Sequence, residues 1–389
     1  MNLGFHYHTP AIEINGSIFM PAYIGLFIDS IAPFFDNLTC FLHTPNELEK
    51  ERMDYPLSSS NVTLVGLGPH SSIPKRMMNF KITGQVFKKH QSQCDLLLLR
   101  ASTPLLPIIK NSWKKPIALL LVSDATSGLD NLPQPFWRKT LIKLWANWYS
   151  NQELKLAKRN LTIVNSQMLY NHLKTKLKDL HVIKTTTLSN NDFYHRENTC
   201  EQAKIRLIFA GRISKIKGLL DILESMAILV KEGFDLELKL VGMVDKKDPI
   251  LLEMKEKATS LNISDRWEYL GYRTAGESLL EEYRKSDVFV IASQSNSEGF
   301  PRTIWEAMAS SLPVVATKVS SIPMFAKGAA ELAMPRDVSS LTNSLRTVLE
   351  NKQRRKEMIT MGMELAKGNT LEKRAKELSE LLISKTSVL

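Results

Sequence analysis

Short apolar runs alternate with helical patterns along most of the chain, and this alternation constrains the fold more than any other feature. Residues 96–99 and 117–122 contain no charged side chain, which is typical of strands buried on both faces of a parallel sheet. Apolar residues spaced by three and four predict helices at 217–231 and 249–260. The sequence therefore predicts an α/β fold. Further strands are expected at residues 161–164, 205–210, 236–242 and 287–292.

The chain has 389 residues, which is long enough for two such sheets. Between residues 185 and 204 the composition turns polar, so we expect an N-terminal domain at 1–190 and a linker at 191–203. A second domain is expected at 204–370, followed by a C-terminal helix at 371–389. Ligands of such sheets bind where loops follow the carboxyl ends of the strands, so the strand-to-helix loops should carry the chemistry.

Several classes of protein are disfavoured by what the sequence lacks. Cys40, Cys94 and Cys200 are far apart and form no Cys-x-x-Cys motif, so neither a disulfide scaffold nor a zinc site is expected. The first residues lack the basic and apolar segments of a signal peptide, which favours a cytoplasmic location. Prolines and an aspartate interrupt the apolar residues 18–35, so no transmembrane helix is expected.

Positive charge is concentrated in one part of the chain. Residues 51–200 hold 21 Lys and Arg but only 9 Asp and Glu, an excess of 12, whereas the whole chain has a formal net charge of +11. A localised basic surface indicates an anionic partner. Nucleic acid, lipid head groups and phosphorylated ligands all satisfy this condition.

The loop at residues 211–218 follows the strand expected at 205–210 and leads into a helix. Its Arg212 and Lys217 lie close to the helix N-terminus, where unsatisfied N–H groups and the helix dipole attract anions. Together these groups suit a diphosphate. The alternative is a solvated basic loop, and that is the expected environment of Lys215.

A second loop, at residues 293–302, connects the strand expected at 287–292 to a helix at 301–311. Glu298 lies in the loop and Glu306 about a turn and a half into the helix, so both could contact one ligand. Carboxylates accept hydrogen bonds from hydroxyl groups, which indicates a sugar or a ribose. The alternatives are an ion pair between Glu306 and Arg302 and a helix-dipole contact for Glu298.

These loops together resemble glycosyltransferase family 4, a group of retaining enzymes with the GT-B fold. The resemblance rests on Gly211-Arg212-x4-Lys217-Gly218, on the Glu298-x7-Glu306 segment, and on Pro313-Val314-Val315-Ala316-Thr317. It extends over residues 204–367, and within 1–190 it rests on topology and short fragments. It implies two Rossmann-like parallel-sheet domains that face a central cleft, with the C-terminal helix returning toward the first domain. The first domain would bind the acceptor and the second the nucleotide sugar.

The resemblance also implies roles for single residues. Arg212 and Lys217 would hold the donor diphosphate, while Glu298 would contact the sugar hydroxyls as a catalytic residue and Glu306 the ribose diol. Pro301 has no N–H. Main-chain donation to the donor substrate would therefore come from Gly299, Phe300, Arg302 and Thr303.

The first domain departs further from the family pattern. Many relatives carry a His-Asp pair at the end of a central strand, and here only Asp124 is present. Asp124 is either catalytic or a turn residue. Gly16 lies in the region where relatives have a glycine loop near the donor phosphates.

No Asp-x-Asp motif occurs, and such a pair commonly binds the metal that bridges a nucleotide diphosphate. We therefore expect no essential metal, and no cofactor besides the nucleotide-diphospho-sugar that serves as donor. Fixed cations would stabilise the leaving diphosphate instead.

The basic segment contains a helical pattern in which Trp137, Trp145 and Trp148 share one face and Lys139 and Lys143 lie opposite. This face either contacts an anionic membrane surface or packs on the sheet of the first domain. Residues 73–89 form a second basic and apolar stretch.

The sequence thus predicts a glycosyltransferase that moves a sugar from a nucleotide-diphospho-sugar to a hydroxyl of a lipid-linked or polysaccharide acceptor. Retention of the anomeric configuration follows from the resemblance alone. We expect a cytoplasmic protein, with peripheral attachment to the inner face of the membrane as one interpretation. A catalytically inactive sugar-nucleotide-binding scaffold is the first alternative, because the histidine is missing. A nucleic-acid-binding protein is the second, but no nucleic-acid motif accompanies the basic segment, so no nucleic-acid partner is expected.

Overall fold

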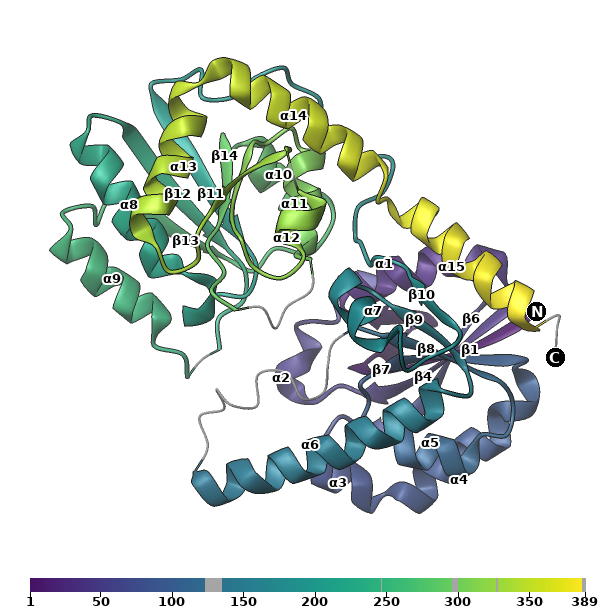
Figure 1. Ribbon diagram of the computed structural model, residues 1–389. Helices are drawn as coiled ribbons and strands as arrows, with labels where there is room; N and C mark the ends of the chain where they lie inside the picture. Colours follow the sequence, from purple (N-terminus) through teal and green to yellow (C-terminus); the bar gives the residue numbers. More distant parts are fainter. Residues whose placement is uncertain (123–134, 246, 296–299, 327, 387–389) are drawn as a thin grey trace. The chain divides into compact units, whose positions relative to one another are not determined.

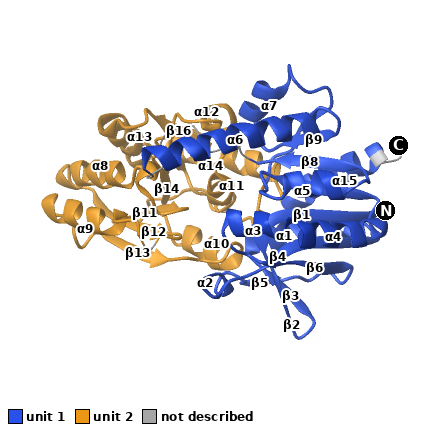
Figure 2. Ribbon diagram, turned by 90° about the horizontal axis from the view of Figure 1, so that it is seen from below, with its two compact units in different colours: residues 1–185, 371–389 blue, residues 186–370 orange. Residues whose placement is uncertain are grey.

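The computed structural model describes the chain except for residues 123–134, 246, 296–299, 327 and 387–389 (Figure 1). The described residues group into two compact units (Figure 2). The first consists of residues 1–185 and 371–389, and the second of residues 186–370. Residues 191–203, which the sequence predicts as a linker, belong to the second unit.

The first unit is built on a seven-stranded sheet in the order β10-β9-β8-β7-β1-β4-β6, and every neighbouring pair is parallel. The sheet thus has the all-parallel form that the apolar runs predict. Its strands are β1 (Asn2–Pro10), β4 (Asn37–Thr44), β6 (Val62–Pro69), β7 (Leu96–Ala101), β8 (Ile117–Leu121), β9 (Leu161–Val164) and β10 (Leu180–Val182).

Both faces of this sheet are covered, and β7 shows why residues 96–99 are continuously apolar. Successive side chains of a strand point to opposite faces. Leu96 and Leu98 join one hydrophobic core, whereas Leu97 and Leu99 join the other. The first core includes side chains of α1 (Ala22–Ile31) and α15 (Leu371–Thr386). The C-terminal helix therefore returns to the first unit, as the resemblance implies.

The second core lies under a group of helices that are neighbours of one another. It includes Phe87, Ile109 and Tyr149, all buried. These residues come from α4 (Phe80–His90), α5 (Leu106–Ser112) and α6 (Phe136–Ala157). The remaining helices of the unit are α2 (Glu47–Lys50), α3 (Ile73–Met78) and α7 (Gln167–Leu173), with short 3-10 turns at Ala32–Phe34 and Gln91–Gln93.

A small antiparallel sheet of β2 (Ile12–Ile14), β3 (Ser17–Met20) and β5 (Tyr55–Pro56) is inserted after β1. Asp29 of α1 ties β5 and the residues after it to the helix. Its carboxylate accepts hydrogen bonds from the Tyr55 hydroxyl at 2.9 Å, from the Ser58 hydroxyl at 2.8 Å and from the Ser59 amide at 3.0 Å. Burial alone would raise the pKa of Asp29, but these hydrogen bonds outweigh it and lower the pKa below its usual value.

The second unit has a six-stranded sheet, again parallel throughout, in the order β13-β12-β11-β14-β15-β16. Its strands are β11 (Lys204–Ala210), β12 (Asp235–Val241), β13 (Trp267–Gly271), β14 (Val288–Ile291), β15 (Val314–Thr317) and β16 (Ala330–Ala333). Its helices are α8 (Leu219–Lys231), α9 (Ile250–Ser260), α10 (Glu277–Arg284), α11 (Arg302–Ala309), α12 (Ile322–Phe325), α13 (Val338–Glu350) and α14 (Lys352–Lys367).

Glycines bring the backbone of neighbouring loops very close at the carboxyl edge of this sheet. A Cβ on Gly218 would lie 2.1 Å from the Ala292 carbonyl oxygen, and one on Gly242 would lie 1.7 Å from that of Gly211. Gly218 also has a φ of +67°. Because of this left-handed residue, α8 begins at Leu219, two residues after the predicted start, and residues 215–217 form a 3-10 turn.

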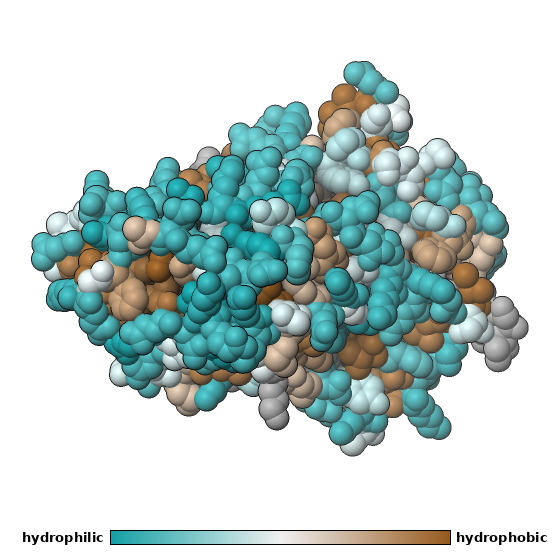
Figure 3. All heavy atoms as spheres, turned by 90° about the horizontal axis from the view of Figure 1, so that it is seen from above, coloured by the Kyte–Doolittle hydropathy of each residue, from teal (hydrophilic) through white to brown (hydrophobic). Residues whose placement is uncertain are grey.

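The surface carries mixed polar and apolar side chains, and the face drawn in Figure 3 is largely hydrophilic with separate apolar patches. Among the described helices, none is both long enough and apolar enough to span a bilayer. The three cysteines are free.

We predict that Gly218→Ala destabilises the second unit more than Gly271→Ala does. Gly271 has a similar φ of +79° but open space around a Cβ, so it reports the cost of the left-handed backbone alone, about 1–2 kcal/mol. Alanine at position 218 must also displace the backbone of Ala292. Urea unfolding of both variants measures the difference, and equal losses of unfolding free energy would contradict the close approach.

Asp29→Asn is expected to lower the free energy of unfolding by about 1.5–3 kcal/mol at neutral pH, because hydrogen bonds to a charged acceptor have about this strength. Since folding lowers the pKa of Asp29, the contribution is complete above the unfolded pKa, near 4, and is lost as the pH falls through the folded value. Urea titrations of wild type and variant across the acid range should therefore converge. A difference that does not depend on pH would be inconsistent with the carboxylate acting as the acceptor.

Candidate functional site

The loops that follow β11 and β14 lie at the carboxyl edge of the second sheet and are bonded to their neighbours. The amide of Ile213 donates to the Met243 carbonyl at 2.8 Å, and the amide of Gln294 donates to the Ile216 carbonyl at 2.8 Å. The side-chain amide of Gln294 donates to the carboxylate of Asp221 in α8, also at 2.8 Å. The three loops after β11, β12 and β14 thus form one ordered cluster, where open α/β sheets bind ligands.

Lys217 and Arg212 occupy this cluster in different environments. Lys217 is only 6% exposed, whereas Arg212 is exposed and forms no ion pair with a described residue. The N-cap of α8 is Gly218, so no side chain accepts from the first N–H groups of the helix. A buried ammonium, a nearby guanidinium and an uncapped helix N-terminus together suit a bound diphosphate. Lys215 is exposed and pairs with Glu253 at 3.3 Å.

Two buried hydroxyl groups at the same edge have no hydrogen-bond partner among the described residues. They are the Oγ atoms of Ser214, in the loop after β11, and Ser293, just after β14. Most buried polar atoms in proteins are paired. Unpaired hydroxyls beside the Lys217 turn are therefore consistent with a polar ligand.

Glu306 lies in α11 and is 6% exposed. One carboxylate oxygen accepts a hydrogen bond from the Thr187 hydroxyl, and the other accepts from the Tyr283 hydroxyl at 3.2 Å. Burial and the charge of Glu306 raise the pKa of Tyr283 well above its usual value, so Tyr283 remains a donor. These two hydroxyls, rather than the guanidinium of Arg302, hold the carboxylate.

The other residues predicted on this loop lie at the start of α11. Phe300 stacks on Trp305, with ring centroids 4.2 Å apart. Pro301 is the N-cap, and no side chain caps the helix. Arg302 and Thr303 form its first turn and are partly exposed. Their amides therefore lie in the first turn of α11.

Three predicted residues, Glu298, Gly299 and Asp124, lie outside the described residues. Gly16 occupies the tip of the β2–β3 hairpin and is exposed. Asn15 and Gly16 both have positive φ, +50° and +79°, which is the backbone of a two-residue hairpin turn. This turn accounts for the glycine. A contact of Gly16 with donor phosphates remains a prediction.

The sequence analysis did not identify Thr187, Tyr283, Ser214 or Ser293. Tyr283 lies on α10 and Thr187 far upstream, and only the folded chain brings both to Glu306. No motif marks them.

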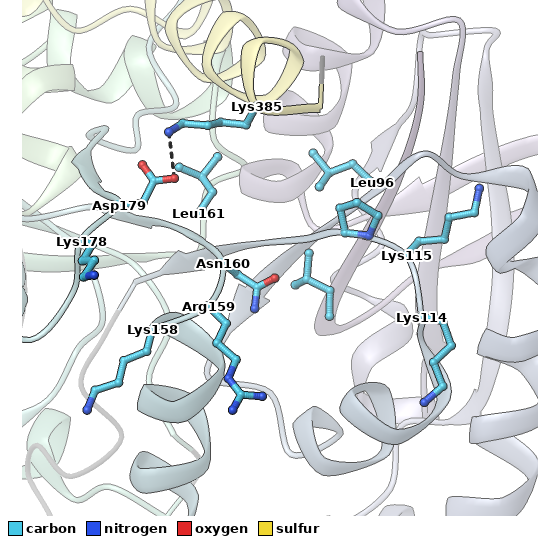
Figure 4. A pocket seen from close by; sticks show the side chains of 12 residues that line it. Leu96, Lys114, Lys115, Lys158, Arg159, Asn160, Leu161, Lys178, Asp179 and Lys385 are labelled. Atoms are coloured by element: carbon cyan, nitrogen blue, oxygen red, sulfur yellow. Dashed lines mark ion pairs between the residues drawn. The ribbon is translucent and has the colours of Figure 1, made fainter. Parts of the chain in front are cut away.

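A basic cavity of about 520 Å³ lies in the first unit and is shown in Figure 4. Its wall includes the first residues of β7, β8 and β9, so it lies at the amino edge of the first sheet. Lys385 pairs there with Asp179 at 2.9 Å. Because ligands of such sheets bind at the carboxyl edge, this cavity is not the candidate reaction site. The other basic side chains around it are Lys114, Lys115, Lys158, Arg159 and Lys178.

Within the described part of the chain, no group of three or more His, Cys, Asp or Glu side chains is arranged to hold a metal ion.

Comparison with known sequences identifies the second unit. Residues 190–364 match the glycosyl transferases group 1 family. Mannosylfructose-phosphate synthase from Agrobacterium fabrum is 29% identical over 167 residues, which cover 40% of this chain and 36% of that protein. The amylovoran biosynthesis glycosyltransferase AmsK from Erwinia amylovora is 27% identical over 31% of this chain and 29% of its own. The chain thus matches about a third of the length of these curated relatives.

Solved structures resemble the whole chain. Sucrose-phosphate synthase from Thermosynechococcus elongatus has a TM-score of 0.75 at 16% identity, with full coverage of both chains. HepE from Anabaena, in complex with UDP and glucose, has a TM-score of 0.72 at 17% identity, covering 99% of this chain and 100% of its own. At such identities the likeness shows the fold, and it confirms the predicted α/β architecture. Residues 190–364 therefore match the glycosyl transferases group 1 family, within a chain that has the two-domain fold of GT-B enzymes.

Proposed function

We propose that the chain transfers a sugar from a nucleotide-diphospho-sugar to a hydroxyl group of an acceptor, with retention of configuration as in glycosyltransferase family 4. The observation that carries this proposal is the turn at residues 215–218, where buried Lys217 adjoins the uncapped N-terminus of α8. HepE was solved with UDP and with UDP-glucose. A uridine diphosphate donor is therefore the first to test.

In this reaction the bond between the anomeric carbon and the diphosphate oxygen breaks, and the acceptor hydroxyl forms the new bond. Negative charge develops on the leaving diphosphate. Lys217, Arg212 and the α8 N-terminus would stabilise that charge without a metal ion, because fixed donors need no reorganisation as the charge appears. Amides at the start of α11, including those of Arg302 and Thr303, would add to this field.

We propose that Glu306 binds the ribose diol of the donor. Each carboxylate oxygen can accept two hydrogen bonds. Thr187 and Tyr283 each use one position, so both oxygens retain capacity for a ribose hydroxyl while the side chain is held in place. Glu298 would contact the sugar hydroxyls and Asp124 would act in the first unit. An inactive scaffold would keep the Lys217 and Glu306 contacts but lack transfer.

For the acceptor we propose a lipid-linked or polysaccharide hydroxyl. AmsK is named for amylovoran biosynthesis, and WaaG, solved at a TM-score of 0.71 and 11% identity, for lipopolysaccharide biosynthesis. These names support a glycan of the cell envelope as the product.

Peripheral attachment to an anionic membrane on its cytoplasmic side is a second part of the proposal, and α6 supports it. Trp137 is 66% exposed, and Leu144, Trp145 and Trp148 on the same helix are also exposed. The alternative, in which this face packs on the sheet, is wrong for the first half of the helix. Lys139 and Lys143 supply charge complementarity to anionic lipids. Helix α4 combines apolar and basic residues in a similar way: Phe80 and Ile82 are exposed, and Lys81 and Lys88 lie on the same helix.

We predict that Lys217→Ala and Arg212→Ala each weaken UDP binding by about 1.5–3 kcal/mol, the range for hydrogen bonds to charged groups. Isothermal titration calorimetry with UDP measures the change. Lys215→Ala is the matched control, because that lysine lies in the same turn but pairs with Glu253. Unchanged UDP affinity in both test variants would contradict the assignment of Lys217 and Arg212 to the diphosphate. An equally large loss of UDP affinity in Lys215→Ala would mean that the effect comes from the overall positive charge of the loop.

The protein is also expected to co-sediment with anionic liposomes more than with neutral ones, and Lys139→Glu with Lys143→Glu should remove the difference. Each basic residue near an anionic surface contributes about 1 kcal/mol, weakened by salt. Lys231→Glu with Lys255→Glu, a charge-matched pair on exposed positions of the second unit, is the control. Trp137→Ala should reduce lipid binding without lowering the melting temperature, because its side chain is exposed. If Trp137→Ala lowers the melting temperature and the wild type shows no preference for anionic liposomes, the proposed membrane attachment is wrong.

A further inference from the structure

Three histidines and an arginine gather at the carboxyl ends of β1, β4 and β6. His8 lies near the end of β1, His43 near the end of β4, and His70 directly after β6. The rings of His43 and His70 are 5.5 Å apart. Arg76 on α3 is close enough for its charge to lower the pKa of both His8 and His43. The cluster belongs entirely to the first unit.

Arg76 is the unusual member of the cluster. Its side chain is 8% exposed, yet its Nε and Nη1 atoms have no hydrogen-bond partner among the described residues. Glu49 is the acid whose charge acts on it. The oxygens of Glu49 are engaged by the His70 ring, at 2.6 Å, and by the amide of Asn46, at 3.0 Å. Buried guanidinium nitrogens without an acceptor destabilise the free protein, which indicates that an anion completes this side chain.

His43 and His70 each have one ring nitrogen that donates a hydrogen bond and one that is unpaired among the described residues. Nδ1 of His43 donates to the Gly68 carbonyl at 3.3 Å, and Nδ1 of His70 donates to Glu49. The Nε2 atoms of both rings are buried and unpaired. Burial, followed by the charge of Arg76, lowers the pKa of His43 to about 4, so its ring is neutral near pH 7. In a neutral ring with Nδ1 protonated, Nε2 is an acceptor. It therefore suits a hydroxyl donor.

A histidine that only supports the fold behaves differently, and His6 of β1 provides the comparison. Its Nδ1 donates to the Phe41 carbonyl at 2.7 Å, and its Nε2 accepts from the Thr103 hydroxyl at 2.8 Å. Both ring nitrogens are satisfied although the residue is fully buried. A metal ion does not explain the unpaired nitrogens, because the described residues offer no metal-holding group and Arg76 repels a cation.

We propose that Arg76, His43 and His70 bind a small molecule that carries an anionic group beside hydroxyl groups, such as a sugar phosphate or a sugar acid. The anion would pair with the Arg76 guanidinium, a hydroxyl would donate to Nε2 of His43, and Nε2 of His70 would form a further hydrogen bond with the ligand. That this molecule is the acceptor, or the anionic end of one, rests on the proposed function. The binding site itself does not.

The experiment is calorimetric titration of the full chain with glucose 6-phosphate, glucuronate and glucose, which share a ring and differ in charge. We expect at least one of the two anions to bind at least tenfold more tightly than glucose, and the comparison of the two distinguishes phosphate from carboxylate recognition. Arg76→Gln should abolish this preference. Lys75→Gln, an exposed neighbour on the same helix, should keep affinity within twofold.

A thermal melt separates binding from folding. Because Arg76 is an unpaired buried charge, Arg76→Gln is expected to keep or raise the melting temperature while it removes anion binding. Equal or absent binding of all three probes to the wild type, or an anion preference that survives Arg76→Gln, would overturn the proposal. Titrations of the same samples with UDP, ADP and GDP test the donor site separately. Anion binding without binding of any of these nucleotides would refute the proposed function and leave this site standing, and the reverse result would do the opposite.

Discussion

Burial of both faces of two parallel sheets is the constraint on which the rest of this molecule depends. Leu96–Leu99 alternate between two separate cores, so no position in the middle of β7 can present a polar group to a ligand. Polar chemistry is therefore confined to the strand ends. At the carboxyl ends the chain turns from strand to helix, and there the N-terminus of α8, whose N-cap is Gly218, adds N–H groups that need an acceptor. The fold thereby determines where a ligand can bind before any particular side chain is considered.

The sequence predicts those parts of the fold whose signal is local. β9 matches its predicted run at both ends, and the runs at 96–99 and 117–122 are found as β7 and β8. β1 and β4 were not predicted, because His6 and His43 break their apolar character. Those histidines are buried through contacts with distant segments, which a local pattern does not contain. The same reason hides Tyr283 and Thr187, which reach Glu306 only after the second unit has folded.

Helix α6 shows a different limit of sequence analysis. A helix that packs on a sheet and a helix that lies on a membrane both need an apolar stripe, so the pattern of tryptophans is compatible with both. The structure separates the two ends of the helix. Tyr149 and Leu156 in its second half are buried in the core, while Trp137 and Leu141 in its first half remain exposed. Stability thus depends on one half of the helix, and the other half is available for a partner.

Arg212 in the second unit and Arg76 in the first unit differ in how much their positive charge destabilises the free protein. In the second unit, Arg212 is exposed and hydrated, so it stabilises a bound anion at little expense to the free protein. In the first unit, Arg76 is buried with two unpaired guanidinium nitrogens, and its desolvation must be compensated by the packing of α3 and the strands around it. An exposed cation attracts many anions. A desolvated one favours the ligand whose shape also supplies hydroxyls to His43 and His70, because a poorly fitting anion leaves those nitrogens unpaired. At the proposed site, selectivity would therefore follow from the same burial that makes the first sheet stable.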